Sequence, residues 1–298
     1  MKYINYIIVC ALMAFSSCLK LDNNFYNKKT LDTYQLDAYM GEQDFILDAS
    51  YAIPSSLISV FTLPSQTLKE TSPTNIYSIY IGDINKISTD TVILYCHGNK
   101  WHMDFYWQRA KLLANVKGKN HFGVLFMDYR GYGLSGGEPS EEGMYADVDA
   151  CMQWLKSKGL TDQRLIIYGF SMGTASATEL CSKPRTLKPS KLILEAPFAS
   201  AAVMVQDASR LNMPGAYVTD LKIDNAEEIK NVKQPFLWIH GLNDNFLNYK
   251  THGEVVYKNY TGVYGSSYMV EGADHGEVPS KIGFEQYKKL IGDFIVKP

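Results

Sequence analysis

Short apolar runs alternate with segments of helical spacing from residue 91 to the end of the chain. Several of these runs are apolar at nearly every position, as is typical of strands buried on both faces of a sheet. We predict strands at 91–96, 122–127, 165–168, 192–194, 236–239 and 264–270. The segments with helical spacing lie at 101–116, 145–158, 172–181, 250–260 and 279–295. This alternation predicts an α/β fold, a mostly parallel sheet with helices on both faces.

Two parts of the chain fall outside the alternation. β-prone runs at 57–63 and 76–81 are separated by turn residues, which predicts an antiparallel hairpin on the edge of the sheet. Residues 196–233 do not alternate either. We predict them as a short cap insertion over the carboxyl ends of the strands.

The first residues have the pattern of an export signal. Lys2 precedes an apolar stretch at 6–15, which is followed by two serines and Cys18. A basic start, an apolar core and small residues before a break are typical of a secretory signal peptide, here residues 1–17. The ending resembles a bacterial lipobox, which implies cleavage before Cys18 and acylation of that cysteine. An ordinary secretory peptide with an incidental cysteine is the alternative.

The stretch that follows the signal is polar. Residues 18–44 are rich in Asn, Lys, Asp and Tyr, and we predict a lipid-anchored polar tether that leads to the body of the protein at 45–298. A lipid on Cys18 would make the membrane a partner through the N-terminus. The predicted location is therefore the bacterial cell envelope, facing the periplasm or the cell exterior.

Composition narrows the function classes. The chain has 29 Lys+Arg and 31 Asp+Glu, a formal net charge of −2, which argues against nucleic acid as a partner because phosphate contacts need an excess of basic residues. Beyond Cys18, the cysteines Cys96, Cys151 and Cys181 are odd in number and contain no CxxC pair. They form neither a disulfide framework nor a zinc site, and we expect all three to be buried.

A candidate nucleophile stands between a predicted strand and a predicted helix. Gly169-Phe170-Ser171-Met172-Gly173 matches G-x-S-x-G in the context that this motif requires. A serine on a sharp strand-to-helix turn has strained dihedral angles, and only very small residues fit two positions before and after it. The turn also aims the Met172 amide at a developing oxyanion. A glycine-rich turn with a surface serine is the alternative.

A base and an acid follow later strands. Asp244 comes just after the strand at 236–239, and His275 comes just after the strand at 264–270. The order Ser171, Asp244, His275 is the order of the α/β-hydrolases. Asp274 is the rival acid, on the tight loop next to His275.

The loop after the strand at 91–96 supplies a second oxyanion donor. Gly98 lets the backbone turn close to the substrate, which suits the amide of Asn99 for this role. His97 is interpreted as a strand-end histidine whose ring bonds to the backbone, with a role as base as the alternative.

The chain resembles the α/β-hydrolase superfamily, in the branch of monoacylglycerol-lipase-like and serine-aminopeptidase-like hydrolases. The matching motifs are His97-Gly98-Asn99, the run from Asp128 to Ser135, the Gly169–Gly173 turn, Gly241 to Asp244, and Gly272 to His275. The resemblance implies an α/β-hydrolase domain with Ser171, Asp244 and His275 as its triad and Asn99 and Met172 as oxyanion donors. It leaves the substrate open, because this fold hosts many reactions.

One glycine-rich motif matches a cofactor-binding fingerprint in form, but we interpret it as a structural loop. The run from Gly131 to Gly136 is formally G-x-G-x-x-G after a strand, the dinucleotide fingerprint. A dinucleotide site needs a helix that opens at the third glycine, whereas Pro139 delays the helix here and three glutamates crowd its start. We expect a structural loop, no cofactor and no metal.

Several substrate classes remain. A carboxylesterase or acyl-lipid hydrolase acting on a small acyl substrate comes first, followed by a peptidase, and then by a thioesterase or deacylase acting on a lipidated partner. A non-catalytic binding protein is the alternative of a different class. For the apolar pocket we expect side chains from the insertion, namely Phe198, Met204, Met213 and Tyr217. A peptidase would need a carboxylate there to hold an amine, with Glu195, Asp207 and Asp220 as candidates.

Overall fold

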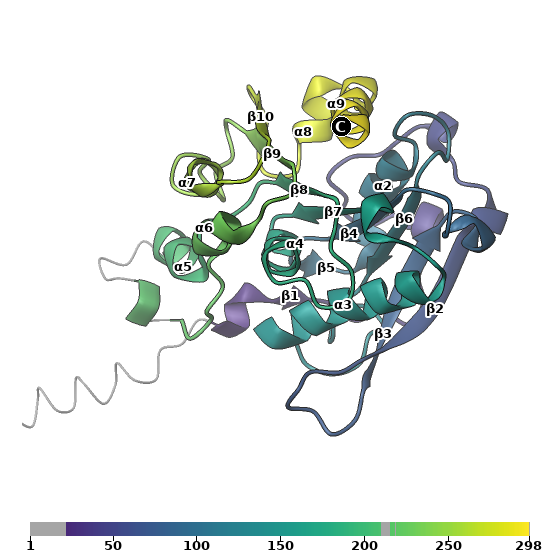
Figure 1. Cartoon of the computed structure of the whole chain (residues 1–298), viewed down its shortest axis with the longest axis horizontal. Coiled ribbons are helices and arrows are strands. Elements are labelled where there is room, and N and C mark those ends of the chain that lie inside the picture. The colour runs from purple at the N-terminus through teal and green to yellow at the C-terminus, as the bar shows by residue number, and fades with distance from the viewer. Residues whose placement is uncertain (1–21, 210–214, 218, 298) are drawn as a thin grey trace, which may run out of the picture.

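The fold is built on a mostly parallel sheet (Figure 1). The computed structural model describes residues 22–209, 215–217 and 219–297. The sheet has eight strands in the order β10-β9-β8-β7-β4-β6-β3-β2. Their bounds are β2 Ile58–Ser65, β3 Thr74–Ile81, β4 Val92–Cys96, β6 Gly123–Met127, β7 Leu165–Phe170, β8 Lys191–Glu195, β9 Phe236–Gly241 and β10 Gly265–Val270. Only β3 runs against the others, so the predicted α/β fold and its edge hairpin are confirmed.

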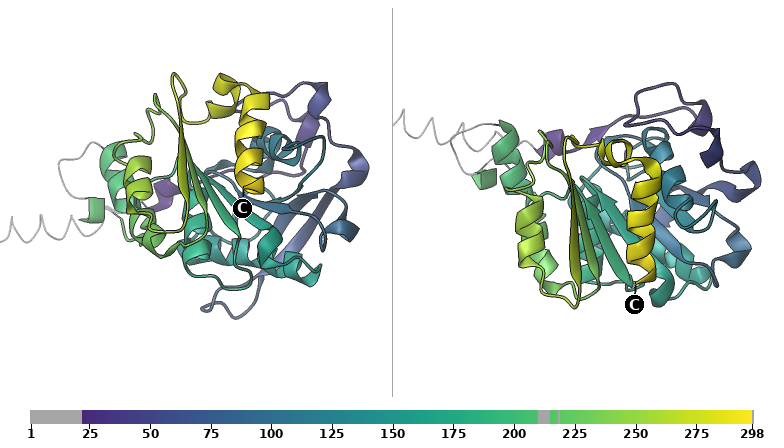
Figure 2. Two further views of the ribbon diagram at one scale, coloured as in Figure 1. Left: turned by 45° about the horizontal axis from the view of Figure 1, so that its top comes forward. Right: turned by 90° about the horizontal axis from the view of Figure 1, so that it is seen from above.

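Helices cover both faces of the sheet. Figure 2 shows α9 on one face and α7 on the other. Helix α2 packs against α9, whereas α3, α4, α6 and α7 form a connected layer across the sheet. The bounds are α2 Met103–Ala114, α3 Glu141–Ser157, α4 Gly173–Ser182, α5 Ala201–Ser209, α6 Asn225–Glu228, α7 Gly253–Asn259, α8 Val278–Ile282 and α9 Phe284–Val296. Among the described residues, no helix is long and apolar enough to cross a membrane.

The strand sequences divide their side chains between two cores. On β4, Val92 and Leu94 face the layer that contains α3 and α4, whereas Ile93 and Tyr95 face α2 and α9. Successive side chains of a strand point to opposite faces, so a run that is apolar throughout suits a strand covered on both sides. All four of these side chains are fully buried. The free cysteines Cys96, Cys151 and Cys181 are buried too, as expected.

The C-terminal helix differs from its predicted form. The sequence predicts one helix at 279–295, but the chain forms α8 and α9 with Gly283 between them. Gly283 has a φ of +84°, a left-handed conformation that ends a right-handed helix and that glycine adopts without steric cost.

The polar tether predicted over residues 18–44 is wrong from Asp22 onward, because this segment lies against the body. The ring of Phe25 is buried and packs edge-on against Phe198, with ring centroids 5.9 Å apart. Strand β1 (Asn27–Lys28) pairs with β5 (Lys100–Trp101). Burial of an aromatic ring and backbone pairing therefore attach this segment to the body, although its composition is that of a solvated linker. Residues 1–21, which include the predicted signal peptide and Cys18, lie outside the described residues.

Part of the insertion at 196–233 lies elsewhere than over the carboxyl ends of the strands. Its helix α6 packs against α4 and α7, in the layer that covers one face of the sheet. Phe198 faces Phe25 and the core, and Tyr217 is 69% exposed. Three of the four side chains expected to line the pocket, those of Phe198, Met204 and Tyr217, do not line it, and Met213 lies outside the described residues.

Candidate active site

The serine motif forms a strained turn between β7 and α4. Ser171 has a φ of +52°, which side chains other than glycine rarely adopt. A Cβ on Gly173 would lie 2.0 Å from the carbonyl oxygen of Cys96, and one on Gly169 would lie 2.8 Å from the carbonyl oxygen of Gly173. Both contacts are with backbone, so only glycine fits at either position. The turn holds Ser171 Oγ at the carboxyl edge of the sheet.

Three loops bring Ser171, His275 and Asp244 into one hydrogen-bonded line. His275 Nε2 lies 2.8 Å from Ser171 Oγ, and His275 Nδ1 lies 2.7 Å from Asp244 Oδ2. The Asp244 side chain is fully buried, whereas 22% of the His275 side chain is exposed. With Nδ1 donating to Asp244, the neutral ring presents Nε2 as an acceptor for the serine hydroxyl. The three residues predicted as a triad therefore meet with the geometry that proton transfer from serine needs.

Asp244 is held as an anion by its loop. Its Oδ1 accepts hydrogen bonds from the amides of Phe246 and Leu247, at 3.0 and 2.7 Å. His240 Nε2 lies 3.3 Å from Oδ2. Burial alone would raise the pKa of Asp244, but the hydrogen bonds from His240, His275 and Leu247 outweigh it and hold the pKa well below its usual range. Asp244 thus remains a carboxylate facing His275.

The rival residues have other contacts. Asp274 Oδ1 accepts hydrogen bonds from the backbone amides of Asn245 and His275, at 3.0 and 2.8 Å. It therefore stabilises the loop through its backbone and not through the imidazole ring of His275. His97 Nδ1 lies 2.7 Å from the carbonyl oxygen of Gly98, and its ring is fully buried. This agrees with the interpretation of His97 as a loop-forming histidine.

The two predicted oxyanion donors belong to a residue that follows the serine in the chain, Met172, and to a residue that lines the same cavity as the serine, Asn99. Met172 occupies the N-cap position of α4, and Asn99 follows Gly98 in the loop after β4. In the described part of the chain, neither amide donates a hydrogen bond. The side chain of Asn99 is anchored to the carbonyl oxygen of Phe25 at 3.0 Å. Both amides are therefore available to a ligand, as the predicted oxyanion donors must be.

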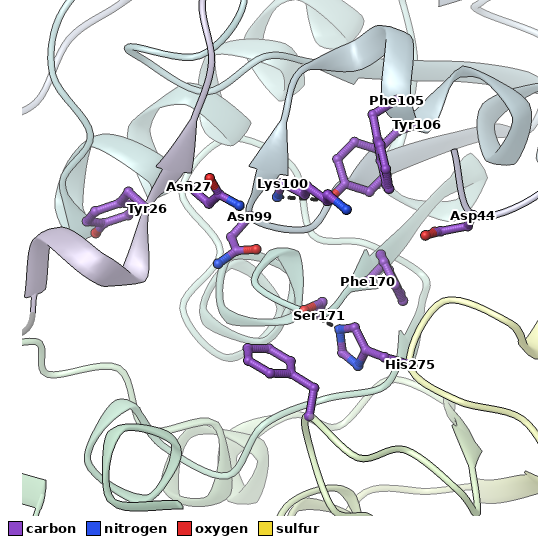
Figure 3. Close-up of a pocket in the computed structure, with 11 residues that line it drawn as sticks. Tyr26, Asn27, Asp44, Asn99, Lys100, Phe105, Tyr106, Phe170, Ser171 and His275 are labelled. Carbon is purple, nitrogen blue, oxygen red and sulfur yellow. Dashed lines mark hydrogen bonds between the residues drawn. The ribbon is translucent and has the colours of Figure 1, made fainter. Parts of the chain in front are cut away.

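A cavity of about 710 Å³ opens over the serine (Figure 3). Among the described residues, five aromatic rings line it, from Tyr26, Phe105, Tyr106, Phe170 and Phe246. Its polar lining comprises Asn27, Asp44, Asn99, Lys100, Ser171 and His275. The N-terminal segment thus supplies part of the pocket wall, which the sequence did not predict. The aromatic residues in the predicted tether were the available signal, because a solvated linker has little use for them.

Beneath the pocket lies a buried ionic network that the sequence did not reveal. Arg109 Nη1 donates to Glu195 Oε1 at 2.6 Å, and Nη2 donates to Asp44 Oδ2 at 3.2 Å. The guanidinium lies 4.2 Å from the centre of the Phe170 ring, which in turn contacts His275. Burial raises the pKa of Asp44 more than Arg109 lowers it. Of the carboxylates proposed for a peptidase, Glu195 belongs to this network, and neither Asp207 nor Asp220 lines the pocket.

The glycine-rich run from Gly131 to Gly136 forms a structural loop. Gly131 and Gly133 have φ values of +77° and +53°, and helix α3 begins only at Glu141, with Ser140 as its N-cap. Because no helix N-terminus opens at Gly136, the loop lacks the pyrophosphate cradle of a dinucleotide fold.

Comparisons with known proteins agree with this architecture. The family model described as serine aminopeptidase, S33, matches residues 87–229. A mouse protein, alpha/beta hydrolase domain-containing protein 17C, is 28% identical over 209 residues, which is 70% of this chain and 60% of the relative. The Caenorhabditis elegans alpha/beta hydrolase domain-containing protein aho-3 is 32% identical over 190 residues, which is 62% of this chain and 52% of the relative. The chain thus spans no more than about three fifths of these two relatives.

Solved structures show the same fold. The Pyrococcus furiosus esterase Pf2001 has a TM-score of 0.61 at 17% identity, covering 80% of this chain and 90% of that chain. An esterase from Exiguobacterium antarcticum, EaEST, has a TM-score of 0.58 at 17% identity, covering 80% of this chain and 100% of that chain. At such identities the likeness concerns the fold.

Proposed function

We propose that this chain, which belongs to the α/β-hydrolase superfamily, is a serine hydrolase that cleaves carboxylic esters of small acyl substrates. The observation that carries the proposal is the line from Asp244 through His275 to Ser171, which ends at the floor of an aromatic-lined cavity. A serine at its ordinary pKa is a poor nucleophile, and a histidine held by a carboxylate is the usual means of activating it.

The residues divide the reaction between them. Ser171 Oγ attacks the acyl carbon while His275 Nε2 takes its proton, and the amides of Asn99 and Met172 donate to the oxyanion. His275 then gives the proton to the leaving alcohol, and an acyl-enzyme remains on Ser171. Water, deprotonated by His275, then attacks the acyl carbon, the bond to Ser171 Oγ breaks, and His275 returns the proton to Oγ as the acid leaves. Asp244 orients the imidazole and stabilises its charged form throughout.

The pocket favours a compact acyl ester. A cavity of about 710 Å³ lined by aromatic rings can enclose a small apolar group. We test the assignment with p-nitrophenyl acetate and butyrate, S-phenyl thiobutyrate and aminoacyl-p-nitroanilides. The esters are expected to give the highest kcat/KM. Faster cleavage of the anilides would instead indicate a serine aminopeptidase, and faster cleavage of the thioester an acyl thioesterase.

We also propose that Cys18 carries a lipid that holds the protein at the bacterial cell envelope. The body binds the chain from Asp22 onward, where this carboxylate accepts the Thr219 hydroxyl and the Asp220 amide. Four residue steps of extended chain reach at most about 14 Å, so the anchored body would lie close to the membrane surface.

Cys18→Ala is expected to shift the protein from the membrane fraction to the soluble fraction, because the acyl chains supply the membrane affinity. Fractionation and immunoblotting measure the distribution. Cys10→Ala, which changes a cysteine inside the predicted signal peptide, is the matched control and should leave it unchanged. If the Cys18 variant still sediments with membranes as the wild type does, the lipid-anchor proposal fails.

A further inference from the structure

The charge of Arg109 is already balanced by Glu195. Both side chains are buried, and their ion pair measures 2.6 Å. The other carboxylate oxygen of Glu195 accepts the hydroxyls of Tyr168 and Tyr287, at 2.5 and 2.6 Å. Every oxygen of this carboxylate therefore has a partner, and the guanidinium has one full counter-charge before Asp44 is considered.

Asp44 adds a second negative charge to this single cation. Its Oδ2 accepts one hydrogen bond from Arg109, at 3.2 Å, and its Oδ1 accepts none from the described residues. The carboxylate faces the cavity, where Figure 3 shows it on the same side of Ser171 as Phe170. Gly276 makes room for it, because a Cβ there would lie 2.5 Å from Oδ1. When Asp44 is ionised, the network therefore has one more negative charge than positive charges, and the surplus faces the pocket.

The other charged groups in the pocket lining have partners of their own. Lys100 forms an ion pair with Glu42 at the rim. His275 is paired with Asp244. Among the described residues that line the cavity, Asp44 is therefore the group whose charge a bound ligand can balance.

We propose that Asp44 is a specificity-determining residue that recognises an ammonium group on the substrate. The substrate class is then an ester with a cationic group in its acyl or alcohol part, and anionic acyl groups are disfavoured. The inference rests on the ester hydrolysis proposed above and adds the charge of the substrate to it. An ammonium at Asp44 Oδ1 would fill its vacant acceptor position and offset the charge that Arg109 leaves unbalanced.

Matched ester pairs test this recognition in the wild type and in Asp44→Asn. 6-Aminohexyl butyrate is compared with heptyl butyrate, and p-nitrophenyl 6-aminohexanoate with p-nitrophenyl heptanoate. Each pair differs in a cationic group against a neutral group of similar size. In the wild type we expect kcat/KM to favour the cationic member of at least one pair by about tenfold, the effect of one hydrogen bond to a charged group. The pair that responds identifies the part of the substrate that Asp44 contacts.

In Asp44→Asn this preference is expected to fall to near unity, with the neutral esters still hydrolysed. Asparagine keeps an oxygen that can accept from Arg109, so the variant should retain its fold, which thermal melting checks. The ratio within a pair is the readout because Asp44 also acts electrostatically on His275, which changes both members alike. Asp293→Asn, an exposed carboxylate on α9 that pairs with Lys117, is the matched control and should keep the wild-type ratio.

A binding measurement separates this inference from the proposed reaction. Ser171→Ala protein is titrated calorimetrically with benzylammonium and with benzyl alcohol, with and without Asp44→Asn. Tighter binding of the ammonium that depends on Asp44 supports the inference even if the wild type hydrolyses none of the esters, a result that would defeat only the proposed function. Equal binding of the two compounds to the protein with Asp44 intact, or a preference that survives Asp44→Asn, overturns it.

Discussion

Ser171→Ala is expected to lower the kcat for p-nitrophenyl butyrate by a factor of about 10⁴ or more, while the protein stays folded. The Oγ atom is the group proposed to attack the acyl carbon, and no other described hydroxyl lies within hydrogen-bond distance of His275 Nε2. Losses of this size or larger follow removal of the nucleophile in enzymes of this mechanism, and oxyanion donors and binding account for the residual rate. Initial rates and a thermal melt measure the two expectations.

Ser176→Ala is the matched control for this substitution. Ser176 lies on the same helix, α4, and its buried Oγ has no partner among the described residues. Removing that hydroxyl should leave kcat unchanged and should not lower stability, since an unsatisfied buried polar atom disappears. Undiminished turnover in Ser171→Ala would remove Ser171 from the mechanism.

The second large effect is expected from Asp244→Asn, which should reduce kcat by about 10⁴-fold with a small change in KM. The amide keeps the size of the carboxylate, but its NH₂ group would face His275 Nδ1. The imidazole would then carry its proton on Nε2 and could not accept the proton of Ser171. Because the pKa of Asp244 lies below its usual range, mild acid should not reproduce this loss through protonation of Asp244.

Asp274→Asn distinguishes the two acids of this region. Its carboxylate binds the amides of Asn245 and His275, and an asparagine oxygen can accept the same hydrogen bonds. We expect kcat within a few-fold of the wild type. A larger loss in Asp274→Asn than in Asp244→Asn would contradict the assignment of Asp244 as the partner of the histidine.

The sequence predicted the strand ends well because the relevant signals are local. Ser171, Asp244 and His275 each lie within a few residues of the end of an apolar strand, and carboxyl ends of parallel strands meet at one edge of the sheet. The glycines beside Ser171 report a steric requirement that a short motif carries in full. Three residues far apart in the chain could therefore be placed together without any knowledge of long-range packing.

The wall of the pocket could not be predicted in this way, because it depends on contacts between distant segments. Phe25 is buried against Phe198, which lies far from it in the sequence. Its polar neighbours gave the segment the composition of a linker. Asp44 likewise becomes part of the site through Arg109, whose partners Asp44 and Glu195 lie far apart in the sequence. Neither composition nor periodicity indicates which distant residues form such pairs.

Labelling with a fluorophosphonate probe, followed by peptide mapping, tests the central claim most directly. The probe reacts with a serine that a neighbouring base has activated, so it reports the mechanism without assuming a substrate. We expect one labelled site on the folded wild-type protein, at Ser171, with no labelling of Ser171→Ala and undiminished labelling of Ser176→Ala. A folded wild-type protein that remains unlabelled, or that is labelled at a different serine, would contradict the account.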